Sequence, residues 1–112
     1  MKAPTLLLLA ACFSGCVSQA PLYYWGSYED QIYAYMNGEN QEAQLRALEN
    51  DRKIIEAESL RAPPGFYAQL GLLYIENGSS AIAAACFEKE KALFPEAAVF
   101  MDYLLGKMQG EN

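Results

Sequence analysis

The residues between Pro63 and Pro95 restrict the fold of this chain more than any other part of the sequence. Large apolar side chains recur there at helical intervals, and glycine or alanine stands where two helices would have to approach closely. The positions are Tyr67, Leu70, Gly71, Tyr74, Gly78, Ala83, Phe87 and Pro95. The pattern predicts a helix over 66–76, a turn at Asn77-Gly78 and a second, antiparallel helix over 79–92.

These eight positions resemble the tetratricopeptide repeat, whose signature places an aromatic residue, Leu-Gly, Tyr, Ala, Phe and Pro within 34 residues. The resemblance implies that residues 64–97 form one repeat, in which Gly71 lets the second helix approach while Ala83 and Phe87 fill the contact. Glu90 stands where the repeat has alanine, which predicts a looser contact with the helix that follows. A generic helical bundle is the alternative interpretation.

Three more helices are expected, over 28–36, 40–60 and 96–107. Ser27 and Asn40 are the predicted N-caps of the first two. The last helix is predicted to pack through Val99, Phe100, Tyr103 and Leu104. The predicted fold is therefore all-α: a short stack of antiparallel helical hairpins, tetratricopeptide-like, with a C-terminal capping helix.

The first 16 residues have the features of an export signal. Lys2 precedes an apolar stretch that is too short to span a bilayer, and the small pair Ser14-Gly15 stands directly before Cys16. This arrangement resembles the lipobox of bacterial lipoproteins, which implies cleavage after residue 15 and lipidation of the Cys16 sulfur. Cleavage at Cys12, after Leu9-Ala10-Ala11, and an unlipidated apolar helix are the alternatives.

The domain organisation follows from this interpretation. Residues 1–15 are the predicted signal peptide, 16–22 a tether and 23–112 the helical domain. No aspartate follows Cys16, and by resemblance to the enterobacterial sorting pattern this implies an anchor in the outer membrane, facing the periplasm.

Composition excludes several classes of function. The chain has no histidine, so Ser-His-Asp and Cys-His catalytic sets and the usual zinc sites are excluded. Its formal net charge of −6 argues against nucleic acid as a partner. The acidic pairs Glu29-Asp30 and Glu88 with Glu90 are interpreted as solvated helix faces rather than acid/base groups. We therefore expect no enzymatic activity, cofactor, metal or small-molecule substrate.

Cys86 is the one cysteine left within the helical domain, among Ala83, Ala84, Ala85 and Phe87. A small buried core residue is the favoured interpretation, and a reactive thiol is the alternative.

An aromatic segment follows the tether and reads Leu-Tyr-Tyr-Trp-Gly-Ser-Tyr-Glu over 22–29. Together with the lipobox it resembles a family of small Gram-negative lipoproteins known as a domain of unknown function. Its characteristic residues here are Tyr24, Trp25, Gly26, Tyr28, Tyr33 and Tyr35. The resemblance implies, as partners, neighbouring lipoproteins of the curli-secretion-channel type.

Tyr24, Trp25 and Tyr28 are the candidate partner-binding residues, because exposed aromatic side chains often anchor protein interfaces. The alternative is that they seal the open end of the helical stack. For the whole chain we expect a lipid-anchored scaffold, or an accessory structural subunit, of an envelope complex. A regulator of peptidoglycan synthesis or hydrolysis is a further candidate, by analogy of fold alone.

Overall fold

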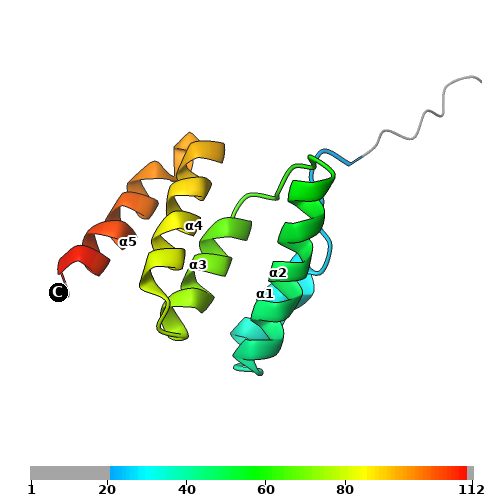
Figure 1. The fold of residues 1–112 in the computed structure, drawn as a ribbon, viewed down its shortest axis with the longest axis horizontal. Helices are drawn as coiled ribbons and strands as arrows, with labels where there is room; N and C mark the ends of the chain where they lie inside the picture. The colour runs from blue at the N-terminus through cyan, green and yellow to red at the C-terminus, as the bar shows by residue number, and fades with distance from the viewer. Residues whose placement is uncertain (1–20, 111–112) are drawn as a thin grey trace, which may run out of the picture.

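The computed structural model describes residues 21–110, which form helices joined by short turns and loops (Figure 1). The elements are α1 (Tyr28–Met36), α2 (Gln41–Ala57), α3 (Phe66–Glu76), α4 (Ser80–Leu93), the 3₁₀ turn η2 (Pro95–Ala97) and α5 (Ala98–Gly110). The all-α prediction is confirmed for this part of the chain. The predicted signal peptide, Cys16 and most of the tether lie outside the described residues.

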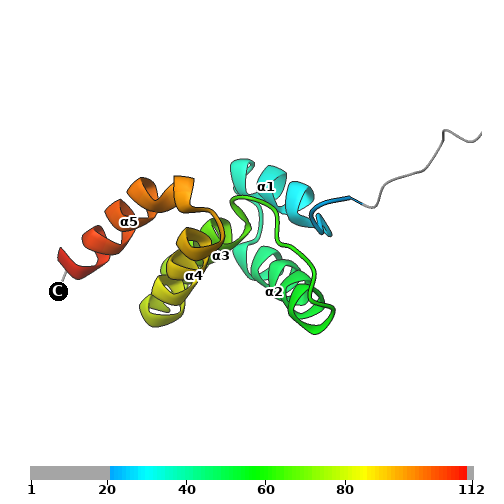
Figure 2. The ribbon, with the colours of Figure 1, turned by 90° about the horizontal axis from the view of Figure 1, so that it is seen from above.

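The helices pack largely as neighbours in sequence. α1 lies against α2, α3 against α4, and α5 against α4, while the contact of α2 with α3 joins the first pair to the second. Figure 2 shows α5 at one end of the molecule and α1 with α2 at the other. The element boundaries differ little from prediction. However, α2 ends at Ala57 rather than near residue 60, and the last helix is preceded by η2.

The contact between α3 and α4 is the tightest part of the core. Ala83 and Phe87 are fully buried, and a Cβ atom added to Gly71 would lie 2.6 Å from Cε1 of the Phe87 ring. A distance under 3 Å is a steric clash, so only glycine allows Phe87 to occupy this position. The predicted roles of Gly71, Ala83 and Phe87 are confirmed.

A second buried cluster joins α2 to α3. It contains Leu48 and Ile55 from α2 and Phe66, Leu70 and Leu73 from α3. Because the two clusters share α3, unfolding of either would expose apolar surface of the other.

The packing face of α5 was predicted wrongly. Met101 is buried and Leu104 is half-buried against α4, but Val99, Phe100 and Tyr103 are 85%, 55% and 57% exposed. The apolar residues of α5 lie on more than one side, so periodicity did not identify the side that α4 covers.

Glu90 was also interpreted wrongly, because its carboxylate is buried and serves the start of α3. The N-cap of α3 is Gly65, which has no side chain to cap the helix, and its amide donates to Oε1 of Glu90 at 2.6 Å. Glu90 on α4 therefore supplies the missing cap of α3 from another helix. Burial raises the pKa of Glu90, while the backbone amides of Gly65, Tyr67 and Ala68 oppose that shift.

We expect Glu90→Ala to cost about 2 kcal/mol of unfolding free energy, because it removes a helix cap and leaves the half-buried Gly65 amide unpaired. Glu90→Gln keeps an acceptor oxygen without the charge. Since the raised pKa means that the folded state disfavours the ionised carboxylate, the stability of the natural protein relative to Glu90→Gln should fall as pH rises through the carboxyl pKa. Urea unfolding of the natural protein and of Glu90→Gln at pH 4 and pH 7 measures this; a natural protein that gains stability relative to Glu90→Gln at the higher pH would contradict it.

Ser59 has a backbone conformation that favours glycine. Its φ is +53°, and it stands just after the C-cap of α2, where the Leu60 amide donates to the Ile55 carbonyl at 2.9 Å. This is the hydrogen bond of a Schellman motif, whose left-handed position is usually glycine.

We therefore expect Ser59→Gly to raise the free energy of unfolding by about 0.5–1 kcal/mol. Gly38→Ala is the opposite control, because Gly38 has φ +68° with no atom near its missing Cβ, so alanine there should destabilise through backbone strain alone. Thermal unfolding of both variants is the measurement, and a lower melting temperature for Ser59→Gly would refute the assignment.

Candidate functional site

The aromatic segment before α1 packs along the loop between α2 and α3. The Tyr24 amide donates to the Arg61 carbonyl at 2.7 Å. Neighbouring aromatic rings then form a continuous series in the order Phe94, Tyr23, Trp25, Tyr28, Phe66 and Tyr67, with centroid separations of 5.2 to 6.3 Å. The series connects the N-terminal segment to the first turn of α3 and to Phe94, the C-cap of α4.

Gly26 and Ser27 are fixed by a buried carboxylate of α2. Asp51 accepts from the Ser27 amide at 3.0 Å and from the Ser27 hydroxyl at 2.6 Å. A Cβ atom on Gly26, whose φ is +47°, would lie 2.5 Å from Oδ1 of Asp51. Ser27 was predicted to cap α1, but its side chain makes no capping bond and is held by Asp51 instead.

Of the three candidate partner-binding residues, Trp25 and Tyr28 belong to this series, and Tyr24 packs against the buried cluster between α2 and α3. Tyr24 and Tyr28 are half-buried, and Trp25 stays 42% exposed while its ring stacks on Tyr28. The Tyr28 hydroxyl also faces the loop before α3, 3.4 Å from the Pro64 carbonyl oxygen. These contacts favour a sealing role for the segment.

If the segment seals the stack, the double change Tyr24→Ala with Trp25→Ala should lower the melting temperature and cost about 2 kcal/mol or more. Tyr33→Ala, at a 70% exposed position on α1, is a matched aromatic control that should change little. An unchanged melting temperature for the double variant, together with a lost binding partner, would instead assign Tyr24 and Trp25 to partner binding.

Two clefts lie side by side between α2 and α4. The larger, of about 730 Å³, lies at the Ser59–Ala62 loop and the end of α4, and the smaller, of about 230 Å³, lies further along both helices. Glu56, Tyr67 and Lys89 line both clefts, so we treat them as one α2–α4 groove. Its other lining residues include Tyr23, Ile55, Leu60, Arg61, Leu93 and Phe94 at one end and Glu49, Arg52, Ile82 and Cys86 at the other.

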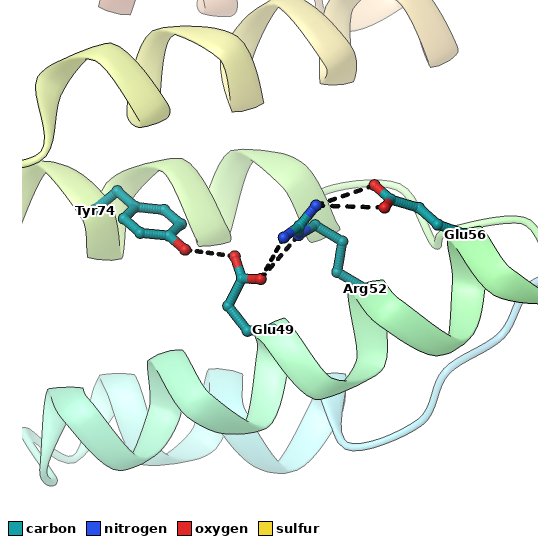
Figure 3. Close-up of polar contacts among 4 residues, drawn as sticks. All are labelled: Glu49, Arg52, Glu56 and Tyr74. Carbon is teal, nitrogen blue, oxygen red and sulfur yellow. Dashed lines mark hydrogen bonds and ion pairs between the residues drawn. The ribbon is translucent and has the colours of Figure 1, made fainter.

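A hydrogen-bonded series forms the polar wall of this groove (Figure 3). Arg52 donates to Glu49 at 2.6 Å and to Glu56 at 3.1 Å, and the Tyr74 hydroxyl of α3 donates to the other oxygen of Glu49. Burial acts to raise the pKa of Glu49, but the bonds from Arg52 and Tyr74 outweigh it and the pKa is lowered. Burial and the bond to Glu49 raise the pKa of Tyr74 to about 12. The series fixes α2 against α3.

Two other cations of the groove differ from Arg52. Arg61 is exposed, and neither Arg61 nor Lys89 forms an ion pair within residues 21–110. Lys89 Nζ lies 5.9 Å from the centroid of the Tyr67 ring. Arg52 is already paired with Glu49 and Glu56. Arg61 and Lys89 are therefore the cations of the groove that can bind a ligand, and they lie beside its apolar walls.

Cys86 is buried under the smaller cleft, and burial raises its thiol pKa to about 11. The thiol is therefore protonated at neutral pH, which agrees with the core interpretation. The described residues hold no group of three or more metal-binding side chains. None of the helices from α1 to α5 is long and apolar enough to cross a membrane.

Sequence reasoning missed the groove because it is formed by two helices, α2 and α4, that are distant in sequence. The sequence shows a leucine close to the end of each helix, Leu60 and Leu93. That both are partly exposed, and so could mark a groove, is known only from the structure.

Comparison with known proteins gives one result. A family model described as Domain of unknown function (DUF4810) matches residues 22–104, from the aromatic segment into α5. No curated protein matches the chain, and no solved structure does either. Since the match covers most of the sequence, including Trp25, Asp51 and the whole α2–α4 groove, this chain belongs to the DUF4810 family.

Proposed function

We propose that this protein is a lipid-anchored protein-interaction module of the cell envelope, with a tetratricopeptide-like helical stack whose α2–α4 groove receives a segment of a partner protein. The α2–α4 groove is the single observation that supports this function best. It is a concave surface of mixed apolar and polar character, as binding sites usually are.

The chemistry of the groove favours one class of occupant. Leu60 and Leu93 are 40% and 45% exposed beside Tyr23 and Phe94, which suits an apolar side chain. Lys89 and Arg61 can each donate to a carboxylate, and they are free of ion pairs with the described residues. The proposed occupant is a peptide segment that carries an apolar residue next to a carboxylate, from a neighbouring envelope protein such as a curli-secretion-channel-like lipoprotein.

The anchor belongs to the same proposal. Lipid on Cys16 would hold the helical domain within a short tether of the outer membrane, where its partners would also be anchored. Mass spectrometry of the mature N-terminus tests this, and a fragment that begins at Cys12 or an unmodified N-terminus would contradict it.

Co-purification of the full-length protein from detergent-solubilised membranes tests the groove. Leu93→Glu with Lys89→Glu replaces one of the two cations that lack an ion pair with a carboxylate and disrupts the apolar wall, at two exposed positions outside the core. Ile75→Glu is the matched control, because Ile75 is a 37% exposed residue of α3 outside the groove.

We expect at least a tenfold loss of a specific envelope protein with the double variant, and full retention with the control. Equal recovery of every envelope protein with both variants would refute the groove as the docking site.

A further inference from the structure

The outer face of α5 is apolar and aromatic, although α5 is the last helix described. Phe100 and Tyr103 are each more than half exposed, and their rings stack 6.4 Å apart at 13°. Val99 is 85% exposed beside them, and Lys107 Nζ lies 5.7 Å from the Tyr103 ring centroid. Terminal helices of stacked arrays normally present polar outer faces. Asp102 borders the same surface, but its carboxylate is bonded to Lys91 at 2.7 Å. α5 therefore presents an aromatic surface, with Lys107 as its one cation outside an ion pair among the described residues, where a polar cap would be expected.

The outer face of α1, at the other end of the described stack, is apolar and acidic. Tyr33 and Met36 are 70% and 79% exposed. Glu29 and Asp30 are exposed one turn earlier, at positions that neighbour Tyr33 on the same helical face. α1 is packed through its opposite side, where Tyr28 and Tyr35 contact the core cluster.

These two faces complement each other in charge and in apolar character. Pairing of two α1 faces would bring the carboxylates of two Glu29 and two Asp30 residues into one interface. Pairing of two α5 faces would bring in two Lys107 side chains, and the carboxylate of that face, Asp102, is already bonded to Lys91. Like charges at an interface are unfavourable. We propose that the occupant of the α5 outer face is the α1 outer face of a second copy of this chain, with Lys107 near Glu29 and Asp30. Such a contact is head-to-tail, so it continues from copy to copy instead of closing as a symmetric dimer.

The proposal does not depend on the α2–α4 groove, because neither outer face contributes a lining residue to it. The two proposals therefore concern separate surfaces of the same chain. Failure of one proposal leaves the other standing, and the two experiments have separate readouts.

A complementation experiment with full-length protein in detergent tests the contact. One variant removes the α5 face, Phe100→Asp with Tyr103→Asp, and the other removes the α1 face, Tyr33→Lys with Met36→Lys. All four positions are more than half exposed, so both variants should keep their melting temperatures.

By analytical ultracentrifugation, the natural protein should form dimers and larger species as concentration rises. Each variant alone should be monomeric, and their mixture should form a dimer with one copy of each. Lys107→Glu leaves the apolar residues intact and should weaken self-association roughly tenfold or more. A mixture of this variant with a second variant, Glu29→Lys, should associate again, because the two exchanged charges then face each other.

Three results would overturn the proposal. The first is a natural protein that stays monomeric at every attainable concentration, which would leave both faces to a different protein. The second is a closed dimer of the natural protein, which would indicate a symmetric contact. The third is self-association that survives in either variant alone.

Discussion

Replacement of Phe87 by Ala is expected to leave the protein largely unfolded. The Phe87 side chain is fully buried, and its ring lies directly against the backbone of Gly71. Loss of a buried phenylalanine costs about 3–5 kcal/mol, which is comparable to the whole stability of a small domain. Urea unfolding followed by circular dichroism measures the effect.

Ile82→Ala is the control for that experiment, because Ile82 lies on the same helix but is 49% exposed. It should cost well under half as much as Phe87→Ala. A loss below about 1 kcal/mol for Phe87→Ala would show that the α3–α4 contact is not the centre of the core.

Asp51→Ala is expected to cost about 3 kcal/mol, because two hydrogen bonds to a buried charged acceptor are lost and the Ser27 amide and hydroxyl are left without it. The segment before α1 should then detach from α2, because the bonds between Ser27 and Asp51 hold it there. Both bonds are accepted by Oδ2, so Asp51→Asn can keep them with its one acceptor oxygen and loses only the charge; it should cost roughly half as much. Equal stability of Asp51→Ala and the natural protein would mean that the Gly26-Ser27 turn does not fix the segment.

Local patterns in the sequence were sufficient for the helices and for the α3–α4 core. Asn40 caps α2 through Ala43 as predicted, at 3.0 Å, because capping involves residues three apart. Gly71 and Phe87 were identified through the resemblance to the tetratricopeptide signature, whose positions all lie within one stretch of 34 residues.

The polar residues were predicted wrongly wherever their partners are distant in sequence. Ser27 bonds to Asp51, 24 residues away, and Glu90 bonds to Gly65, 25 residues away. Each polar side chain had a plausible local role, a cap for Ser27 and a solvated helix face for Glu90. Burial and a stronger partner supplied by another helix determined the outcome in both cases.

The candidate site was predicted only in part. Tyr24, Trp25 and Tyr28 are near one another in sequence, and the structure shows Trp25 stacked on Tyr28 and Tyr28 packed against Phe66. Their role in partner binding remains a prediction. The groove depends on how far α2 stands from α4 across α3, and no single segment encodes that distance.

Site-specific photo-crosslinking in intact cells tests the central claim most directly, that the α2–α4 groove binds a partner. A photoreactive amino acid replaces Lys89, which lines both clefts, and in a control it replaces Glu88, which is exposed on the same helix but lines neither. We predict a discrete adduct with one envelope protein from position 89 and no such adduct from position 88. The same adducts from both positions, or none from position 89, would contradict the account.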